Sequence, residues 1–195
     1  MTGDNTAPKI DDDLLDRVLI GGRQRPTIVI VDYDPDWPRC FELEREKIAR
    51  ALRARPEMIE HIGSTSVPGL AAKPIIDILV TLEEAEIEDD QRLVADLEAA
   101  GYELRVREPG HRMFRTPARD VHIHVFANDS DEIDRYFLLR NRLRRSAEDR
   151  ELYAATKREL AQREWSDMNY YADAKTDVIQ AILTHAREDR RRGIV

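Results

Sequence analysis

Apolar residues recur along the chain at two spacings, and each spacing predicts one kind of secondary structure. Short runs that are rich in β-branched residues or alternate with polar ones predict strands at 27–32, 60–62, 74–80, 102–107, 112–116 and 121–126. Longer stretches with apolar residues three or four positions apart predict helices at about 37–53, 89–100, 131–145, 147–165 and 172–188. Together they predict an α+β fold, in which helices cover a mixed sheet and a helical C-terminal part packs at one end.

The N-terminal part of the chain carries weaker signals. Residues 1–25 show no sustained period, which predicts a poorly ordered arm with a short helix near 13–19, and residues 26–190 then form a single domain. Asp36 is a candidate N-cap for the helix at 37–53, which would place Phe41, Ile48 and Leu52 on one face. Cys40, the single cysteine, is predicted to be a small buried apolar residue.

Composition and charge narrow the classes of function. The chain of 195 residues is 42% hydrophobic and 36% charged, which is typical of a soluble protein, and no apolar run reaches the length of a membrane helix. The net charge of −8 repels polyanions, so nonspecific nucleic-acid binding is not expected, although a local basic pocket for a small anion stays open. The N-terminal residues lack the apolar stretch of a signal peptide, which predicts a cytoplasmic location.

The segment His61–Val80, HIGSTSVPGLAAKPIIDILV, is predicted to be the functional centre. A turn made of Gly63, Ser64, Thr65 and Ser66 directly follows a predicted strand. Glycine lets a ligand approach the backbone closely, and the hydroxyls and amides can donate hydrogen bonds to phosphate oxygens. An ordinary Ser/Thr turn is the alternative, and the P-loop pattern G-x-x-x-x-G-K-[ST] is absent here.

Asp77 gives this turn a chemical partner. It interrupts the apolar run IIDILV, in which a strand buried on both faces would carry only apolar residues. A buried carboxylate is costly unless it meets a metal, a cation or several hydrogen-bond donors. Asp77 is therefore a candidate catalytic and metal-ligating residue, with the capping of a neighbouring turn as its alternative role.

The same segment resembles the signature of the GrpB family, whose members have a nucleotidyltransferase-like fold. The resemblance extends to DYDPDWP at 32–38 and VHIHVF at 121–126, and more weakly to RYFLLRNRLR at 135–144 and to Tyr153, Lys157, Tyr171 and Lys175. It covers about residues 28–185 and implies that the mixed sheet, its covering helices and the helical C-terminal part form a fold of the nucleotidyltransferase kind.

The resemblance also implies a chemistry, from which this sequence departs. In the superfamily the Gly-Ser turn binds a triphosphate, paired carboxylates in D-x-[DE] hold divalent metal, and a neighbouring strand supplies a third carboxylate. Here Leu79 occupies the second carboxylate position, and the strand that should carry the third reads His122-Ile123-His124. The departure argues against ordinary two-Mg²⁺ catalysis, because Mg²⁺ prefers oxygen ligands.

His122 and His124 suggest another site. They are two positions apart and so share one strand face, and the implied fold would bring them beside Asp77. Asp77, His122 and His124 are thus candidate metal ligands and catalytic residues, and such a set suits Mn²⁺, Fe²⁺ or Zn²⁺ better than Mg²⁺. Alternatively, the imidazoles bind phosphate, act as a general base, or only tie Asp77 down. His61 could join any of these arrangements.

Five basic residues are candidate phosphate ligands. Lys73 belongs to the signature, and Arg112 lies in a predicted strand. The helical part supplies Arg140, Lys157 and Lys175, for which solvation at the surface is the alternative. Tyr153, Tyr171 and Trp165 are expected to fill the core between helices and sheet.

These observations lead to three hypotheses for function. The first is a metal-dependent enzyme that binds a nucleotide or phosphorylated small molecule and transfers a nucleotidyl group from an NTP to a small-molecule acceptor. The divalent metal would be Mg²⁺ or Mn²⁺, or else Zn²⁺. The second is a ligand-binding or folding-assistance module of the same fold without catalysis. The third is metal-dependent hydrolysis of a phosphorylated metabolite. The sequence leaves the oligomeric state open.

Overall fold

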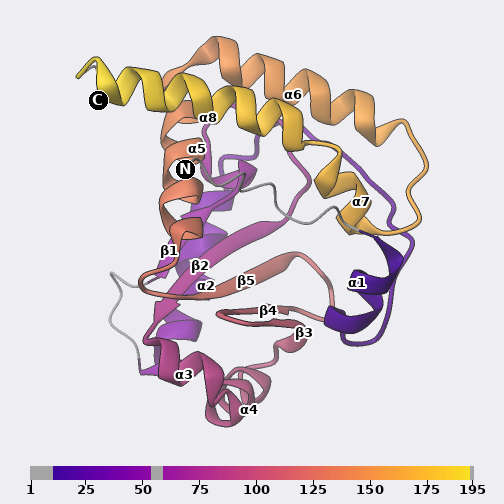
Figure 1. Cartoon of the computed structure of the whole chain (residues 1–195), viewed down its shortest axis with the longest axis vertical. Coiled ribbons are helices and arrows are strands. Elements are labelled where there is room, and N and C mark those ends of the chain that lie inside the picture. The colour runs from indigo at the N-terminus through magenta and orange to yellow at the C-terminus, as the bar shows by residue number, and fades with distance from the viewer. Residues whose placement is uncertain (1–10, 54–58, 194–195) are drawn as a thin grey trace, which may run out of the picture.

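A computed structural model describes residues 11–53 and 59–193. Five strands form one sheet in the order β1-β2-β5-β4-β3 (Figure 1). They are β1 Ile59–Ile62, β2 Ile76–Leu82, β3 Glu103–Glu108, β4 His111–Arg115 and β5 Val121–Ala127. The central strands β2 and β5 run parallel, whereas every other neighbouring pair is antiparallel. The predicted α+β fold with a mixed sheet is confirmed.

Helices cover both faces of this sheet. They are α1 Asp12–Val18, α2 Trp37–Leu52, α3 Glu84–Glu88, α4 Gln91–Ala99, α5 Asp131–Arg145, α6 Ala147–Ala161, α7 Met168–Asp173 and α8 Thr176–Arg191, with the 3-10 helix η2 at Ser64–Ser66. Helices α2 and α4 pack on one face, and α5 contacts β1 from the other. Helices α6 and α8 pack on α5, so the helical C-terminal part closes over one end of the second face (Figure 1).

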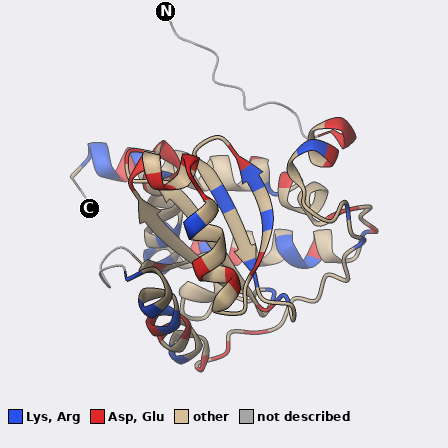
Figure 2. Ribbon diagram, turned by 90° about the horizontal axis from the view of Figure 1, so that it is seen from below, with Lys and Arg blue, Asp and Glu red and all other residues tan. Residues whose placement is uncertain are grey.

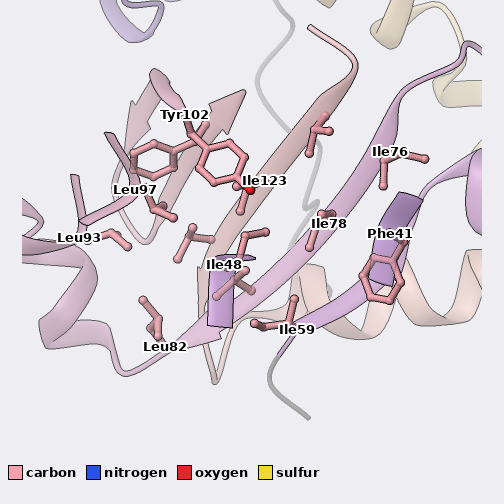
Figure 3. Packing of buried hydrophobic residues seen from close by; sticks show 14 of the residues in the cluster. Phe41, Ile48, Ile59, Ile76, Ile78, Leu82, Leu93, Leu97, Tyr102 and Ile123 are labelled. Atoms are coloured by element: carbon pink, nitrogen blue, oxygen red, sulfur yellow. The ribbon is translucent and has the colours of Figure 1, made fainter. Parts of the chain in front are cut away.

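The alternation of side chains along β2 separates the main core from the site. Ile76, Ile78 and Val80 point toward α2 and α4, where Ile78 meets Ile123 of β5 in a fully buried layer (Figure 3). Burial of such a side chain stabilises the fold by roughly 1.5–3 kcal/mol. Because side chains alternate with a period of two, Asp77 points to the opposite face, toward the C-terminal helices.

The strand predicted at 27–32 is wrong. Val31 forms only an isolated bridge with Ala72, and Val29 is 54% exposed. The β-branched residues favour an extended backbone, but a strand also needs a neighbouring strand to pair with. Here β1 pairs with β2 and not with residues 27–32.

Helix α2 confirms two expectations and corrects a third. Phe41 and Ile48 are buried on one face, with Leu52 packed beside them. Asp36 occupies the N-cap position without a capping bond from its side chain. Pro38 lies in the first turn, where the N–H that proline lacks would have no partner within the helix. Cys40 is exposed, because it precedes Phe41 by one position and therefore points away from the core.

The structure describes the N-terminal segment from Asp11 onward, whereas residues 1–10 of the predicted arm lie outside the described residues. Helix α1 begins with a capping bond from the Leu14 N–H to the Asp11 side chain, and Leu15 is buried. After α1, Leu19 bridges to Val106, which attaches the segment to the edge strand β3.

The other predicted helices differ mainly at their ends. The helix predicted at 147–165 ends at Ala161, and the one at 172–188 divides into α7 and α8. Helix α3 was not predicted. Within residues 11–53 and 59–193, no helix has the length and apolar character needed to cross a membrane.

Candidate active site

The site begins where β1 meets β2. Ile62, the last residue of β1, pairs with Asp77, and Gly63 then turns the chain with φ 69° and ψ −173°. Only glycine adopts this conformation readily. A Cβ atom at Gly63 would lie 2.8 Å from the Asp77 Cβ atom. The glycine therefore allows the turn to pass directly against the carboxylate.

The hydroxyls of this turn have different surroundings. Thr65 Oγ1 donates to the Ile75 carbonyl at 3.0 Å, and Ser66 Oγ donates to the Gly63 carbonyl at 2.7 Å. Both side chains are buried and hold the turn in shape. Only Ser64 faces the cavity above Asp77, where its Oγ accepts a hydrogen bond from Lys157 Nζ at 2.9 Å. Of the hydroxyls predicted to bind phosphate, Ser64 alone is brought to the cavity.

The structure does not bring His61 to Asp77. His61 points to the other face of the sheet, where its ring stacks on Phe41 with centroids 4.7 Å apart. Burial lowers the pKa of His61 to about 4, and Nε2 lies 3.0 Å from Thr65 Oγ1. His61 thus supports the Gly-Ser turn from behind.

Asp77, His122 and His124 converge on one point. In the parallel pair β2–β5, Asp77 lies opposite His122 and Leu79 opposite His124. Asp77 Oδ1 is 3.6 Å from His122 Nδ1 and 4.0 Å from His124 Nε2. One ligand atom from each of the three residues lies within 4.8 Å of the others, which is close enough to hold a single metal ion. Two imidazoles and one carboxylate are a donor set that suits Mn²⁺, Fe²⁺ or Zn²⁺.

The electrostatics of this cluster favour metal-ligating forms. Burial acts to raise the pKa of Asp77, but the hydrogen bond and charge of His122, together with the charge of Lys73, outweigh it, so the pKa is lowered. Burial lowers the pKa of His124 to about 3. At neutral pH the carboxylate is therefore ionised and the His124 imidazole is neutral, as metal ligation requires.

Sequence reasoning missed a further histidine, His111, which contacts His124 from behind. His111 Nε2 lies 3.4 Å from His124 Nδ1, and His111 Nδ1 lies 2.9 Å from Glu108 Oε2. His111 also stacks on Phe126, with ring centroids 4.2 Å apart. A partner on the far nitrogen fixes the tautomer and orientation of a ligating imidazole. His111 precedes His124 by thirteen positions in the sequence, so only the β4–β5 register shows that the two residues are neighbours.

Three lysines from separate parts of the chain surround a cavity of about 310 Å³ above Asp77. Lys157 of α6 is only 3% exposed, and its Nζ donates to Ser64 and to the Ala71 carbonyl. Lys73 lies over the Tyr171 ring at 5.3 Å and Lys175 at 4.8 Å. The cavity is therefore rich in positive charge and narrow, which suits a compact polyanion.

The lysines titrate unusually low because they are buried together. Burial, with the nearby charges of Lys175, Arg158 and Lys73, lowers the pKa of Lys157 to about 7. Burial and Lys175 lower the pKa of Lys73 to about 8, and burial lowers that of Lys175. Asp77 acts against each of these shifts. A bound anion would restore the charge of all three.

Tyr153 and Tyr171 are buried, as expected of core residues, but they also line this cavity. Burial raises the pKa of Tyr153 to about 12. The Tyr171 hydroxyl is buried and has no hydrogen-bond partner within the described residues. Trp165 packs edge-on against the Tyr171 ring, and its indole N–H donates to the Leu160 carbonyl.

Two predicted phosphate ligands are already paired with carboxylates. Arg140 lines the cavity, but it pairs with Glu60 at 3.0 Å and donates to the His61 carbonyl. Arg112 is buried on the opposite face of the sheet and pairs with Asp90. Because neighbouring residues of a strand point to opposite faces, Met113 of β4 faces the site and Arg112 cannot.

Comparison with known proteins shows the family of this chain. The sequence matches the family described as GrpB protein over residues 27–185. The chain belongs to the GrpB family. Among its relatives, the UPF0157 protein SCO7215 of Streptomyces coelicolor is 50% identical over 173 residues, which cover 89% of this chain and 91% of the relative. The family predicted from the signature segment is thereby confirmed.

Two solved structures are similar to this chain in fold. The crystal structure of the conserved protein GrpB from Enterococcus faecalis is similar with a TM-score of 0.71 and 35% identity, covering 83% of this chain and 99% of that one. The Cid1 poly(U) polymerase with MgGTP bound is similar with a TM-score of 0.51 and 17% identity, covering 69% and 45%. At this identity the second similarity shows the fold alone.

Proposed function

We propose that this GrpB protein binds the triphosphate of an NTP above Asp77 and transfers the nucleotidyl group to a small-molecule acceptor. The observation that carries the proposal is the convergence of Lys73, Lys157 and Lys175 with Ser64 around one cavity beside a single carboxylate. Buried lysines with lowered pKa values are costly to the fold, so their clustering is best explained by an anionic ligand. The nucleotidyltransferase-like fold supports the same ligand class.

In the proposed reaction the chain positions the phosphates and receives a proton. The lysines and Ser64 hold the β- and γ-phosphates, and the free Tyr171 hydroxyl donates to a phosphate oxygen. The acceptor oxygen bonds to the α-phosphorus while the bond from that phosphorus to the bridging oxygen breaks, and pyrophosphate leaves. His122 lines this cavity and also a second cavity beside it, which is described below. It can therefore take the acceptor's proton when it is not a metal ligand.

Asp77 and His124, with or without His122, would hold a divalent ion. Their donor set fits Mn²⁺ or Zn²⁺ better than Mg²⁺. A bound ion would neutralise phosphate charge and orient the in-line attack. His111 and Glu108 would support the site by fixing the His124 ring.

A thermal-shift screen tests the proposed ligand. We expect NTPs with Mn²⁺ or Zn²⁺ to raise the Tm of the wild type, because a ligand that binds only the folded state stabilises it. Lys175→Met should weaken NTP binding about 10- to 100-fold, the value of one charge-assisted hydrogen bond. The matched control is Lys47→Met, since Lys47 lies over Tyr102 on the other side of the sheet. Equal binding by both variants, or none by the wild type, would refute the proposal.

The affinity for a triphosphate should fall as the pH rises. Lys157 and Lys73 have pKa values of about 7 and about 8, and Lys175 and Asp77 face the same cavity. A bound polyanion raises the lysine pKa values, so above about pH 7 the complex binds more protons than the free protein. By linkage the affinity decreases, by up to about tenfold per pH unit for each lysine, between about pH 7 and pH 9.

Titration of a non-hydrolysable ATP analogue across this range measures the effect. The stability of the unliganded protein should instead rise with pH, because both pKa values lie below the ordinary lysine value of 10.5. The unfolded chain then binds more protons over this interval, so stability rises with pH. A Kd that is constant between about pH 7 and pH 9 would show that these lysines do not contact the ligand.

One observation favours the second candidate, a binding module without catalysis. Leu79 is 1% exposed and packs with Ile62 and Phe126, so it supplies no metal ligand at the second carboxylate position. Such a module would bind nucleotide in the thermal-shift screen but release no pyrophosphate. A pyrophosphate assay with a panel of acceptors therefore separates the two candidates.

A further inference from the structure

A second cavity, of about 560 Å³, opens directly beside the triphosphate cavity. Lys73 and His122 line both cavities, so the two share a wall beside the candidate metal ligand His122. The second cavity is bounded by the site-side face of β3 and β4 and by the segment that follows α1. In Figure 2, basic positions interrupt the strands in the middle of the molecule, whereas many acidic positions lie on the outer helices.

The sheet register aligns the two cavities. Asp77 lies opposite His122 in β5, and His122 lies opposite Arg115 in β4, so the three form one row across the site face. Neighbouring strands are about 4.8 Å apart, which puts the Arg115 backbone about 10 Å from that of Asp77. An arginine side chain at this distance can hold one end of a small molecule whose other end reaches Asp77.

Three arginines that line this cavity have no carboxylate partner among the described residues. Within the described residues, Arg105, Arg115 and Arg119 form no ion pair. Arg105 is held by the carbonyls of Ile20 and Gly22. Arg115 donates to the Gln24 side chain at 3.2 Å, while its Nε is buried and has no partner in the described part of the chain.

The acidic residues that line the cavity have other partners. Asp120 accepts a hydrogen bond from Thr116 at 2.6 Å. Asp167 accepts from the Gln24 N–H at 2.7 Å and from Asn169. Burial, with the nearby charges of Arg105 and Arg119, lowers the pKa of Arg115, while the charge of Glu103 acts in the opposite direction. A half-buried guanidinium with a buried, free N–H donor is matched best by a planar or tetrahedral oxyanion.

We propose that this second cavity binds the acceptor, and that the acceptor is a small molecule with a carboxylate or phosphate group held by Arg115 and Arg119. The term acceptor rests on the proposed nucleotidyl transfer, but the anion site does not. In the complete reaction the acceptor's hydroxyl oxygen, at the end facing His122, bonds to the α-phosphorus. Its proton passes to His122 as pyrophosphate leaves.

Calorimetric titration with three probes tests the site. Glycerol 3-phosphate and succinate carry the two anionic groups, and glycerol is the neutral control. We expect one or both anions to bind the wild type, and Arg115→Met to lower that affinity at least about tenfold. Arg119→Asn should also weaken binding without unfolding, because this exposed residue has a positive φ of 64° that asparagine tolerates. Arg92→Ala, exposed on α4, is the matched control.

The outcomes separate this inference from the proposed function. Arg115→Met that loses the anion but still binds a non-hydrolysable ATP analogue with Mn²⁺ supports a separate acceptor site. Anion binding without any nucleotide binding keeps the site and refutes the transferase proposal. If neither anion binds the wild type, or if both arginine variants bind it as the wild type does, the inference is overturned.

Discussion

Replacement of Gly63 by alanine is expected to destabilise the protein by about 3 kcal/mol and to lower its Tm by about 6–12 °C. The backbone at Gly63 has φ 69° and ψ −173°, a region that is essentially restricted to glycine. The added Cβ atom would also lie 2.8 Å from the Asp77 Cβ atom and 2.9 Å from its Cγ atom. Asp77 would have to move, so metal affinity and nucleotide binding should fall together with stability.

Gly69→Ala provides the matched control. Gly69 also has a positive φ, 77°, but a Cβ atom there would meet nothing within 4 Å. Its loss should therefore cost only the backbone strain, about 1 kcal/mol, and leave nucleotide binding unchanged. Thermal unfolding and Mn²⁺ titration of both variants measure the difference. Equal effects of the two substitutions would mean that the close approach of Gly63 to Asp77 is unimportant.

The local sequence was sufficient to predict much of the fold and part of the site. The run IIDILV identified both a buried strand and its exceptional carboxylate, because an aspartate in an apolar run needs a chemical reason. The spacing of His122 and His124 put both on one strand face. Their meeting with Asp77 depended on the parallel β2–β5 pairing, which the family resemblance implied and the register now provides.

Other site residues could not be predicted because their roles depend on pairings between distant segments. From the sequence alone, either Arg112 or Met113 could face the site. The alternation of side chains along β4 points Arg112 toward Asp90 and Met113 toward the site. The three hydroxyls of the Gly-Ser turn are equivalent in sequence, yet the 3-10 helix turns Thr65 and Ser66 inward. Lys157 and Lys175 lie in charged helical sequence typical of a solvated face, and only the packing of α6 and α8 with α5 encloses them.

Substitution of Asp77 by asparagine should abolish metal-dependent turnover, with a loss of at least about a thousandfold. Asparagine keeps the shape of the side chain but removes the only carboxylate in the ligand set, and metal assistance contributes several kcal/mol to such reactions. The fold should persist, since the Asp77 side chain faces the cavity and remains 29% exposed. Mn²⁺ titration and pyrophosphate release measure the two parts of the effect.

The Asp77→Asn variant should also change the pH dependence of triphosphate binding, which the loss of a purely structural aspartate would not do. Asp77 raises the pKa values of Lys73, Lys157 and Lys175, so its neutralisation should lower all three and shift the pH profile of triphosphate binding to lower pH. Asp32→Asn is the matched control, because Asp32 is 94% exposed and pairs with Arg158 at the surface. Asp77→Asn with unchanged Mn²⁺ affinity and an unchanged pH profile would place the chemistry of this protein elsewhere.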